Sequence, residues 1–165
     1  MKFARTPADV PTALVAAFSY DRKVLLERHV HGRDLAISVL DGPDGPEALP
    51  IVEAVPREED SYDFTARYEI GRTRFECPAQ LDDAVAARAR EVALEAYGAL
   101  GCSGFGRVDV MLEEATGDLF VLELNPIPGL TETSLLPQAA EAAGLVFEEP
   151  VEQTVPPTLP VAGQE

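Results

Sequence analysis

The chain has 165 residues, of which 46% are hydrophobic and 25% are charged, so we expect one soluble globular domain with a sizeable core. A formal net charge of −16 at pH 7 disfavours binding to nucleic acids and to anionic membrane surfaces, both of which attract clustered Lys and Arg. No apolar run is long enough to cross a bilayer, and the first residues lack a signal-peptide pattern, which favours the cytoplasm. Cys77 and Cys102 are too few for a disulfide framework.

A first helix is expected over residues 11–20, because apolar residues recur there at helical spacing. Either Pro7 or Pro11 can mark its start, since proline fits only in or before a first helical turn. Apolar runs bounded by turn signals then predict three strands, at residues 23–30, 34–40 and 49–55. The intervening turns are expected at residues 31–33 and 41–46.

The segment from residue 56 to residue 77 has no clean period, and we expect a functional loop followed by a short strand. The strongest helix pattern spans residues 82–100. Asp82 or Asp83 can cap this helix, and Gly101 can end it in the left-handed conformation. Its core-facing stripe is predicted to consist of Val85, Ala89, Val92, Ala96 and Leu100.

A hairpin from Arg107 to Asn125, a Pro/Gly loop and a short helix over residues 134–143 complete the ordered part. We assign residues 1–149 to one domain and expect the Pro-rich tail, residues 150–165, to be disordered. The predicted fold class is α+β, with a mostly antiparallel sheet and helices packed on one side of it.

The hairpin carries the side chains best suited to chemistry. Alternate residues of a strand share a face, so Arg107, Asp109 and Met111 are expected to point to one side of its first strand. In the second strand the two faces are expected to hold Val121, Glu123 and Asn125 on one side and Phe120, Leu122 and Leu124 on the other. Phe120 is then expected to lie in the core, and Met111 either fills core space or lines a pocket.

A three-residue loop at residues 115–117 suits this hairpin. Its register predicts three cross-strand pairs: Glu114 with Asp118, Asp109 with Glu123, and Arg107 with Asn125. Two opposed carboxylates repel each other without a counter-charge, and Mg²⁺ prefers such oxygen ligands. Asn125 would add a neutral oxygen, and Arg107 could neutralise phosphate charge. On spacing alone, a solvated strand face with Arg107 screening the acids is an equally good interpretation.

The loop after the hairpin leads directly into the last helix. Gly129 would let backbone amides approach a ligand closely. Ser134 stands at the helix start, where free N–H groups and the helix dipole favour an anion such as a carboxylate. Ser134 could also be a plain N-cap.

The segments LGCSGFGRVDVML and LFVLELNPIPGLTETSLLP, with CPAQL and LLERHVHGRDLAISVL, resemble the C-terminal ATP-grasp part of D-alanine–D-alanine ligases. The similarity runs in one order from about Ala8 to Phe147. In that family, ATP activates the carboxylate of one D-alanine as an acyl phosphate, and the amine of a second D-alanine attacks it. The resemblance implies ATP and D-alanine as substrates and two Mg²⁺ (or Mn²⁺) ions as cofactors.

The resemblance also implies a role for each matching residue. Arg107 would stabilise the transferring phosphoryl group, and the Gly129 amide would help to hold the oxyanion. Ser134 and Leu135 would hold the carboxylate of the second D-alanine. The implied metal ligands are Asp109, Glu123 and Asn125. The implied nucleotide-binding residues are Glu27, Arg28, His29, Val30, Asp34, Arg67, Tyr68 and Met111.

Four positions depart from the family's usual residues. Asp34 stands where a Glu contacts the ribose, Arg67 stands where a Lys is usual in the lid over the site, and Ser61 stands where an aromatic often packs near the adenine. These three changes bear on nucleotide affinity, and Arg and Lys in particular are not equivalent at a phosphate. Thr133 stands where a His is common, which leaves the acceptor amine open.

A complete ligase of this kind has an N-terminal domain and a central lobe ahead of the part that this chain resembles. The chain alone is therefore expected to lack ligase activity, because half of the positioning groups are missing. Its partner would be the missing lobe or further copies of itself. A fragment, a misplaced gene start and a split protein are all open as origins. The alternative functions are a part of another ATP-grasp carboxylate–amine ligase and a non-catalytic module that binds a nucleotide or a protein partner.

Overall fold

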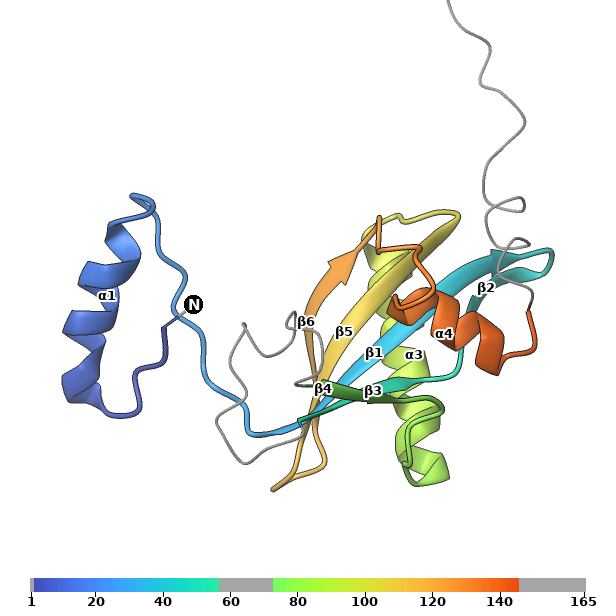
Figure 1. Ribbon diagram of the computed structural model, residues 1–165, viewed down its shortest axis with the longest axis horizontal. Helices are drawn as coiled ribbons and strands as arrows, with labels where there is room; N and C mark the ends of the chain where they lie inside the picture. Colours follow the sequence, from blue (N-terminus) through green and yellow to red (C-terminus); the bar gives the residue numbers. More distant parts are fainter. Residues whose placement is uncertain (1, 57–72, 146–165) are drawn as a thin grey trace, which may run out of the picture.

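The computed structural model of the protein describes residues 2–56 and 73–145. Within these ranges six strands form one sheet: β1 (Gly32–Gly42), β2 (Gly45–Ala48), β3 (Val52–Pro56), β4 (Thr73–Glu76), β5 (Phe105–Glu113) and β6 (Leu119–Asn125). Five of them lie in the order β4-β3-β1-β5-β6, and β2 pairs with the C-terminal end of β1 (Figure 1). Every pairing between these strands is antiparallel, which confirms the predicted α+β class with its antiparallel sheet.

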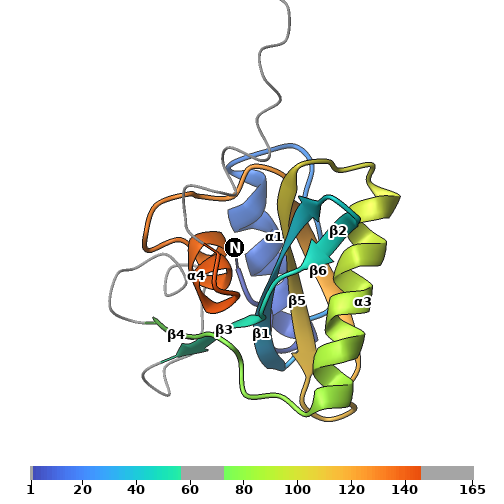
Figure 2. The same cartoon turned by 90° about the vertical axis from the view of Figure 1, so that its right-hand side faces the viewer.

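Two helices cover opposite faces of the sheet (Figure 2). Helix α3 (Asp83–Ala99) packs on one face, where its buried residues meet alternate residues of β1 and β5. Helix α4 (Leu135–Ala142) packs its alanines against Ala36 and Val52 on the other face. The expectation that the helices pack on one side of the sheet is therefore wrong, because α4 lies on the face opposite to α3. In the structure, β1 accordingly has a run of seven consecutive buried residues, 34–40, because both of its faces are covered.

Helix α3 lies where it was predicted, with Asp82 as its extended N-cap and Gly101 in the left-handed conformation after it. Its fully buried residues are Ala89, Ala93 and Tyr97. Leu100 was expected in this stripe but is exposed, because the helix ends one residue earlier.

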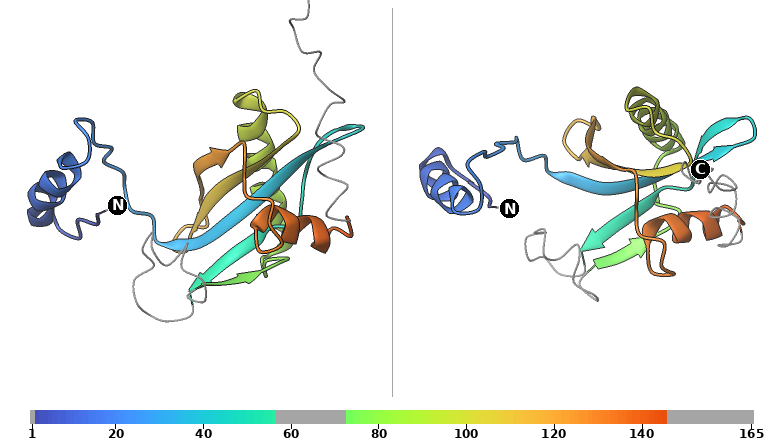
Figure 3. Two further views of the ribbon diagram at one scale, coloured as in Figure 1. Left: turned by 45° about the horizontal axis from the view of Figure 1, so that its top comes forward. Right: turned by 90° about the horizontal axis from the view of Figure 1, so that it is seen from above.

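The N-terminal part of the chain stands apart from the sheet (Figures 1 and 3). It consists of a 3-10 turn, η1 (Pro7–Asp9), helix α1 (Val10–Phe18) and an extended linker, residues 21–31. The predicted first helix is confirmed, with Pro11 in its first turn. The predicted strand at residues 23–30 is wrong, because the linker pairs with no strand among the described residues and its leucines are exposed. No described helix is long and apolar enough to span a bilayer.

Boundaries within the sheet differ from prediction in three places. Gly32 and Arg33, expected in a turn, begin β1 instead. The predicted turn at residues 41–46 tightens to Pro43 and Asp44 between β1 and β2. The predicted strand at residues 49–55 becomes the shorter β3, while the short strand expected before residue 77 is confirmed as β4.

Two hydrogen bonds to the Asp41 carboxylate fix the segment that leads into β5. The Tyr97 hydroxyl donates to Asp41 Oδ1 at 3.2 Å, and the Gly104 N–H donates to Asp41 Oδ2 at 2.6 Å. Burial first, and then the Asp41 carboxylate, raise the pKa of Tyr97 well above its usual value. The hydroxyl therefore remains a donor. A Cβ at Gly106 would lie 3.3 Å from the Tyr97 ring, so Gly106 packs closely against that ring. This contact fixes the position of β5 just before Arg107.

Candidate functional site

The two central cross-strand pairs of the hairpin form as predicted. Asp109 of β5 lies opposite Glu123 of β6, and Arg107 lies opposite Asn125. The predicted loop is wrong in its length. Residues 114–118 connect the two strands, and the Glu113 N–H donates to the carbonyl of Asp118 at 2.8 Å. The expected pair of Glu114 with Asp118 is therefore absent from the ladder.

A β-bulge reconciles these two findings. Near the turn, Met111 lies opposite Phe120, and Val110 lies opposite Val121. Between Val110 and Asp109 the register shifts by one residue, so Leu122 is the extra residue of the bulged strand. The shift returns Glu123 and Asn125 to the side on which they were predicted.

The bulge also moves Phe120 to the other face from the one predicted. Because paired residues share a face, Phe120 lies with Met111 and Asp109. Its ring carries the Arg28 guanidinium, whose Cζ is 4.8 Å from the ring centroid. Arg28 Nη2 also lies 3.3 Å from Glu113 Oε1, which fastens the linker to the hairpin.

Arg107 and Asp109 form a two-pronged ion pair along β5. Arg107 Nε donates to Asp109 Oδ1 at 2.7 Å, and Nη2 donates to Oδ2 at 3.0 Å. The Asp109 side chain is 0% exposed and the Arg107 side chain is 12% exposed. A buried carboxylate depends on such charge-assisted hydrogen bonds, so this pair keeps an anion in a site from which water is excluded.

The donor set on this face suits a hard divalent cation. Asp109 and Glu123 supply carboxylates on adjacent strands, and Asn125 supplies an amide oxygen that also accepts from the Ile127 N–H at 3.1 Å. In the described part of the chain, no three His, Cys, Asp or Glu side chains form a ready metal cluster. One or two carboxylates, completed by water and phosphate, are what Mg²⁺ takes in nucleotide sites, so these residues fit that ion.

The loop after β6 brings Gly129 against the start of α4. Ser134 is the N-cap of α4, as predicted, and its backbone is extended, but its side chain makes no capping bond. Its Oγ instead lies 2.8 Å from Thr131 Oγ1. Leu135 and Leu136 are the first helical residues, and their amides have no acceptor within the helix. Ser134 therefore presents a hydroxyl beside free amides.

Gly129 is required by this packing. A Cβ at Gly129 would lie 2.7 Å from Ser134 Oγ, closer than real Cβ contacts allow. We expect Gly129→Ala to push the Ser134 hydroxyl away and to cost about 1 kcal/mol of stability, measured by urea unfolding. In a Ser134→Ala background the same change should cost almost nothing. An equal cost in both backgrounds would show that the strain lies elsewhere.

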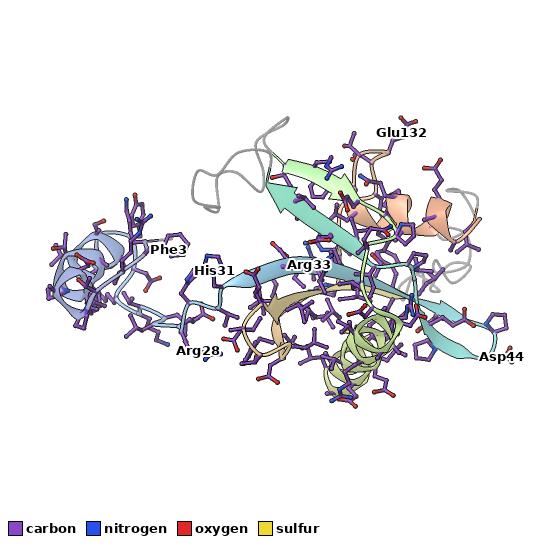
Figure 4. All side chains as sticks on the ribbon, turned by 90° about the horizontal axis from the view of Figure 1, so that it is seen from below. Phe3, Arg28, His31, Arg33, Asp44 and Glu132 are labelled. Carbon is purple, nitrogen blue, oxygen red and sulfur yellow. The ribbon has the colours of Figure 1, made fainter. Side chains whose placement is uncertain are left out.

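The residues expected to bind the nucleotide divide into three groups. Asp34 of β1 is buried directly opposite Met111 of β5, so these two are neighbours on the face of Asp109. The stretch from Glu27 to Val30 lies in the linker rather than at a strand end, and Figure 4 shows Arg28 and His31 along it. The His29 ring meets Phe3 and His31 edge-on, at 5.2 and 6.1 Å between centroids. Arg67 and Tyr68, like the tail from residue 150, lie outside the described residues.

Sequence reasoning missed one residue of this face. Ser38 lies opposite Arg107 in the β1–β5 ladder and is fully buried. Within the described ranges its Oγ has no hydrogen-bond partner. Strand parity would have found it, because Asp34, Ala36 and Ser38 alternate along β1 and share the face of Asp109.

Comparisons with known proteins identify the family of the chain. A family model described as "D-ala D-ala ligase C-terminus" matches residues 1–156. A D-alanine–D-alanine ligase from Syntrophobacter fumaroxidans is 40% identical over 148 residues, 89% of this chain and 47% of the relative. One from Pseudoalteromonas translucida is 40% identical over 159 residues, 96% of this chain and 50% of the relative. The chain thus spans about half the length of the curated relatives it matches.

Solved structures show the same fold. A D-alanine–D-alanine ligase from Bacillus anthracis, complexed with ATP, matches with a TM-score of 0.75 and 30% identity over 93% of this chain and 48% of that one. The VanG D-Ala:D-Ser ligase from Enterococcus faecalis matches with a TM-score of 0.72 and 27% identity over 90% of this chain and 43% of that one. The chain belongs to the D-alanine–D-alanine ligase family, of which it contains the C-terminal ATP-grasp part.

Proposed function

We propose that this chain supplies the nucleotide-, metal- and acceptor-binding part of a D-alanine–D-alanine ligase that works in the cytoplasm and makes a peptidoglycan precursor. The observation that carries the proposal is the hairpin register, which sets Asp109 opposite Glu123 and Arg107 opposite Asn125. A solvated strand face was the competing interpretation, and the full burial of Asp109 argues against it.

Asp109, Glu123 and Asn125 would hold two Mg²⁺ or Mn²⁺ ions. Held there, such ions would supply positive charge against the phosphates of ATP. Arg107 lies against Asp109 with its guanidinium nearly enclosed, so it can place a fixed positive charge where negative charge develops on a transferred phosphoryl group. Asp34 and Met111 would line the nucleotide pocket, and Glu27 to Val30 would bound it from the linker. Arg67 and Tyr68 would also bind the nucleotide.

The start of α4 would hold the acceptor. Free amides at a helix N-terminus favour an anion, and the hydroxyl of Ser134 adds a donor to that of Leu135. The Gly129 amide would sit close to the reacting carbonyl, because the residue carries no side chain there. These groups suit the carboxylate of a second D-alanine.

A second acceptor class is supported by one observation. The VanG D-Ala:D-Ser ligase shares this fold at 27% identity, and Thr133 stands beside Ser134 in the acceptor loop. The Thr133 hydroxyl lies 3.3 Å from Thr131 Oγ1, so it belongs to a hydroxyl cluster that could accept a hydroxylated amine. Adding D-serine and D-alanine separately to a completed ligase would separate the two acceptors by their kcat/KM.

Calorimetric titration of the full chain with Mg-ATP tests the proposal. We expect binding that Glu123→Gln weakens at least about tenfold, because one carboxylate ligand is lost. Glu132→Gln is the matched control: it removes the same charge from an exposed loop position, and should leave the affinity unchanged. A folded chain that binds no Mg-ATP would instead support a module that binds a protein partner. Without its other half, the chain should show no D-alanine-dependent phosphate release.

A further inference from the structure

The Ser38 hydroxyl of β1 lies in the interior of the protein without a hydrogen bond. The side chain is 0% exposed, and no residue in the described ranges bonds its Oγ. A buried hydroxyl that makes no bond has given up its water and gained nothing in return, so it lowers the stability of the fold. Such a group in a folded protein calls for a physical explanation.

The register of the sheet brings Arg107 against this hydroxyl. Ser38 lies opposite Arg107 in the β1–β5 ladder. At the end of this ladder the Asp41 N–H donates to the Gly104 carbonyl at 2.8 Å. Hydrogen-bonded and non-hydrogen-bonded pairs alternate along antiparallel strands, and alternation back to residue 38 makes Ser38 and Arg107 a non-hydrogen-bonded pair. Side chains approach each other most closely in pairs of that type.

The Arg107 guanidinium is turned along β5 toward Asp109 instead. Its Nε and Nη2 donate to the two carboxylate oxygens at 2.7 and 3.0 Å, and its Nη1 donates to neither. The guanidinium would be repelled by a divalent cation that binds the same oxygens at the Asp109–Glu123 pair. Because the Arg107 side chain is only 12% exposed, it then needs another acceptor inside the protein. Across β1, Ala36 lies opposite Asp109 and offers no polar side-chain atom, whereas Ser38 offers a hydroxyl.

We propose that Ser38 is a positioning residue for Arg107, and that its hydroxyl accepts a hydrogen bond from the guanidinium when a divalent cation occupies the Asp109–Glu123 pair. Asn125, opposite Arg107 on β6, is a poorer acceptor because its Oδ1 already accepts a main-chain N–H. The bond would hold the Arg107 charge in place after it leaves Asp109, and it would satisfy the buried hydroxyl. This inference rests on the proposed metal site and adds a residue of β1 to it.

Ser38→Ala tests the proposal through two measurements with opposite expected signs. In EDTA the variant should be more stable than the parent chain, with a urea midpoint higher by about 0.5 M, because it removes an unbonded buried hydroxyl. Its affinity for Mn²⁺, measured from the EPR signal of the free ion, should be at least about fivefold lower, because the displaced guanidinium has lost its acceptor. Ser103→Ala, at an exposed loop residue, is the control and should change neither quantity.

A double-mutant cycle shows whether Ser38 acts through Arg107. In an Arg107→Met background, Ser38→Ala should leave the Mn²⁺ affinity unchanged. An equal fall in affinity in both backgrounds would overturn the proposal. So would a lower urea midpoint of Ser38→Ala in EDTA, since the hydroxyl would then already be bonded, for instance to a buried water.

The same titrations separate this inference from the proposed function. Mn²⁺ binding that Glu123→Gln weakens and Ser38→Ala does not would overturn the role of Ser38 and leave the metal site standing. A folded parent chain that binds no Mn²⁺ would overturn both.

Discussion

Arg107→Met is expected to lower the free energy of unfolding by about 3 kcal/mol, measured with urea in EDTA. The substitution removes the two charge-assisted hydrogen bonds that Arg107 donates to Asp109, whose side chain is fully buried. Breaking a buried ion pair from one side costs about 3–5 kcal/mol, because the remaining buried charge has lost that partner. Methionine keeps much of the side-chain volume, so little of the loss comes from packing.

The same variant probes the metal site. If Asp109 is a metal ligand, saturating Mg²⁺ should restore part of the lost stability of Arg107→Met, since a cation that binds only the folded state stabilises it. The double variant Arg107→Met/Asp109→Asn should be more stable than Arg107→Met in EDTA and should respond less to Mg²⁺. Equal stabilities of the single and double variants would contradict the buried-charge explanation.

Gly32→Ala is expected to destabilise the protein by about 3 kcal/mol or more. A Cβ at Gly32 would lie 1.9 Å from the Leu112 carbonyl oxygen and 2.7 Å from its carbon. Both atoms belong to the backbone of β5, so the β1–β5 ladder must open to make room. The first pairs of that ladder also fix the linker that carries Arg28.

Gly98→Ala is the matched control for this substitution. Gly98 lies inside α3, and a Cβ there would meet nothing within 4 Å. Alanine in a helix interior should stabilise by about 0.5–1 kcal/mol. Urea unfolding of both variants checks the pair. A Gly32→Ala protein as stable as the parent would show that β1 and β5 are farther apart than described.

Much of the fold could be predicted because the strongest local signals coincide with the final elements. The α3 helix has Asp82 before it and Gly101 after it, and both act at the expected ends. The structure of the N-terminal segment, residues 2–31, could not be predicted in the same way. Residues 23–30 have the apolar content of a strand, but a strand also needs a partner, and local sequence does not specify one. Gly32 was expected in a turn, whereas its lack of a side chain serves a close approach between strands.

The two central cross-strand pairs of the hairpin were predicted correctly although one step was wrong. The expected three-residue loop would have placed the whole ladder in one register. The real turn and the bulge at Leu122 displace the register in opposite directions, so Asp109 still faces Glu123. Between the turn and the bulge no compensation occurs, and Phe120 and Val121 exchange faces. The contact of Phe120 with Arg28 depends on that exchange and could not be predicted from local pattern.

Binding of Mn²⁺ to the full chain, followed by paramagnetic broadening of its backbone amide signals, tests the proposed site most directly. We expect broadening first at Asp109, Glu123 and Asn125, on adjacent strands. Glu123→Gln should weaken this broadening at least about tenfold, and Glu132→Gln should not. Broadening centred on the acidic turn near Glu113 and Asp118, or unaffected by Glu123→Gln, would contradict a metal site at the Asp109–Glu123 pair.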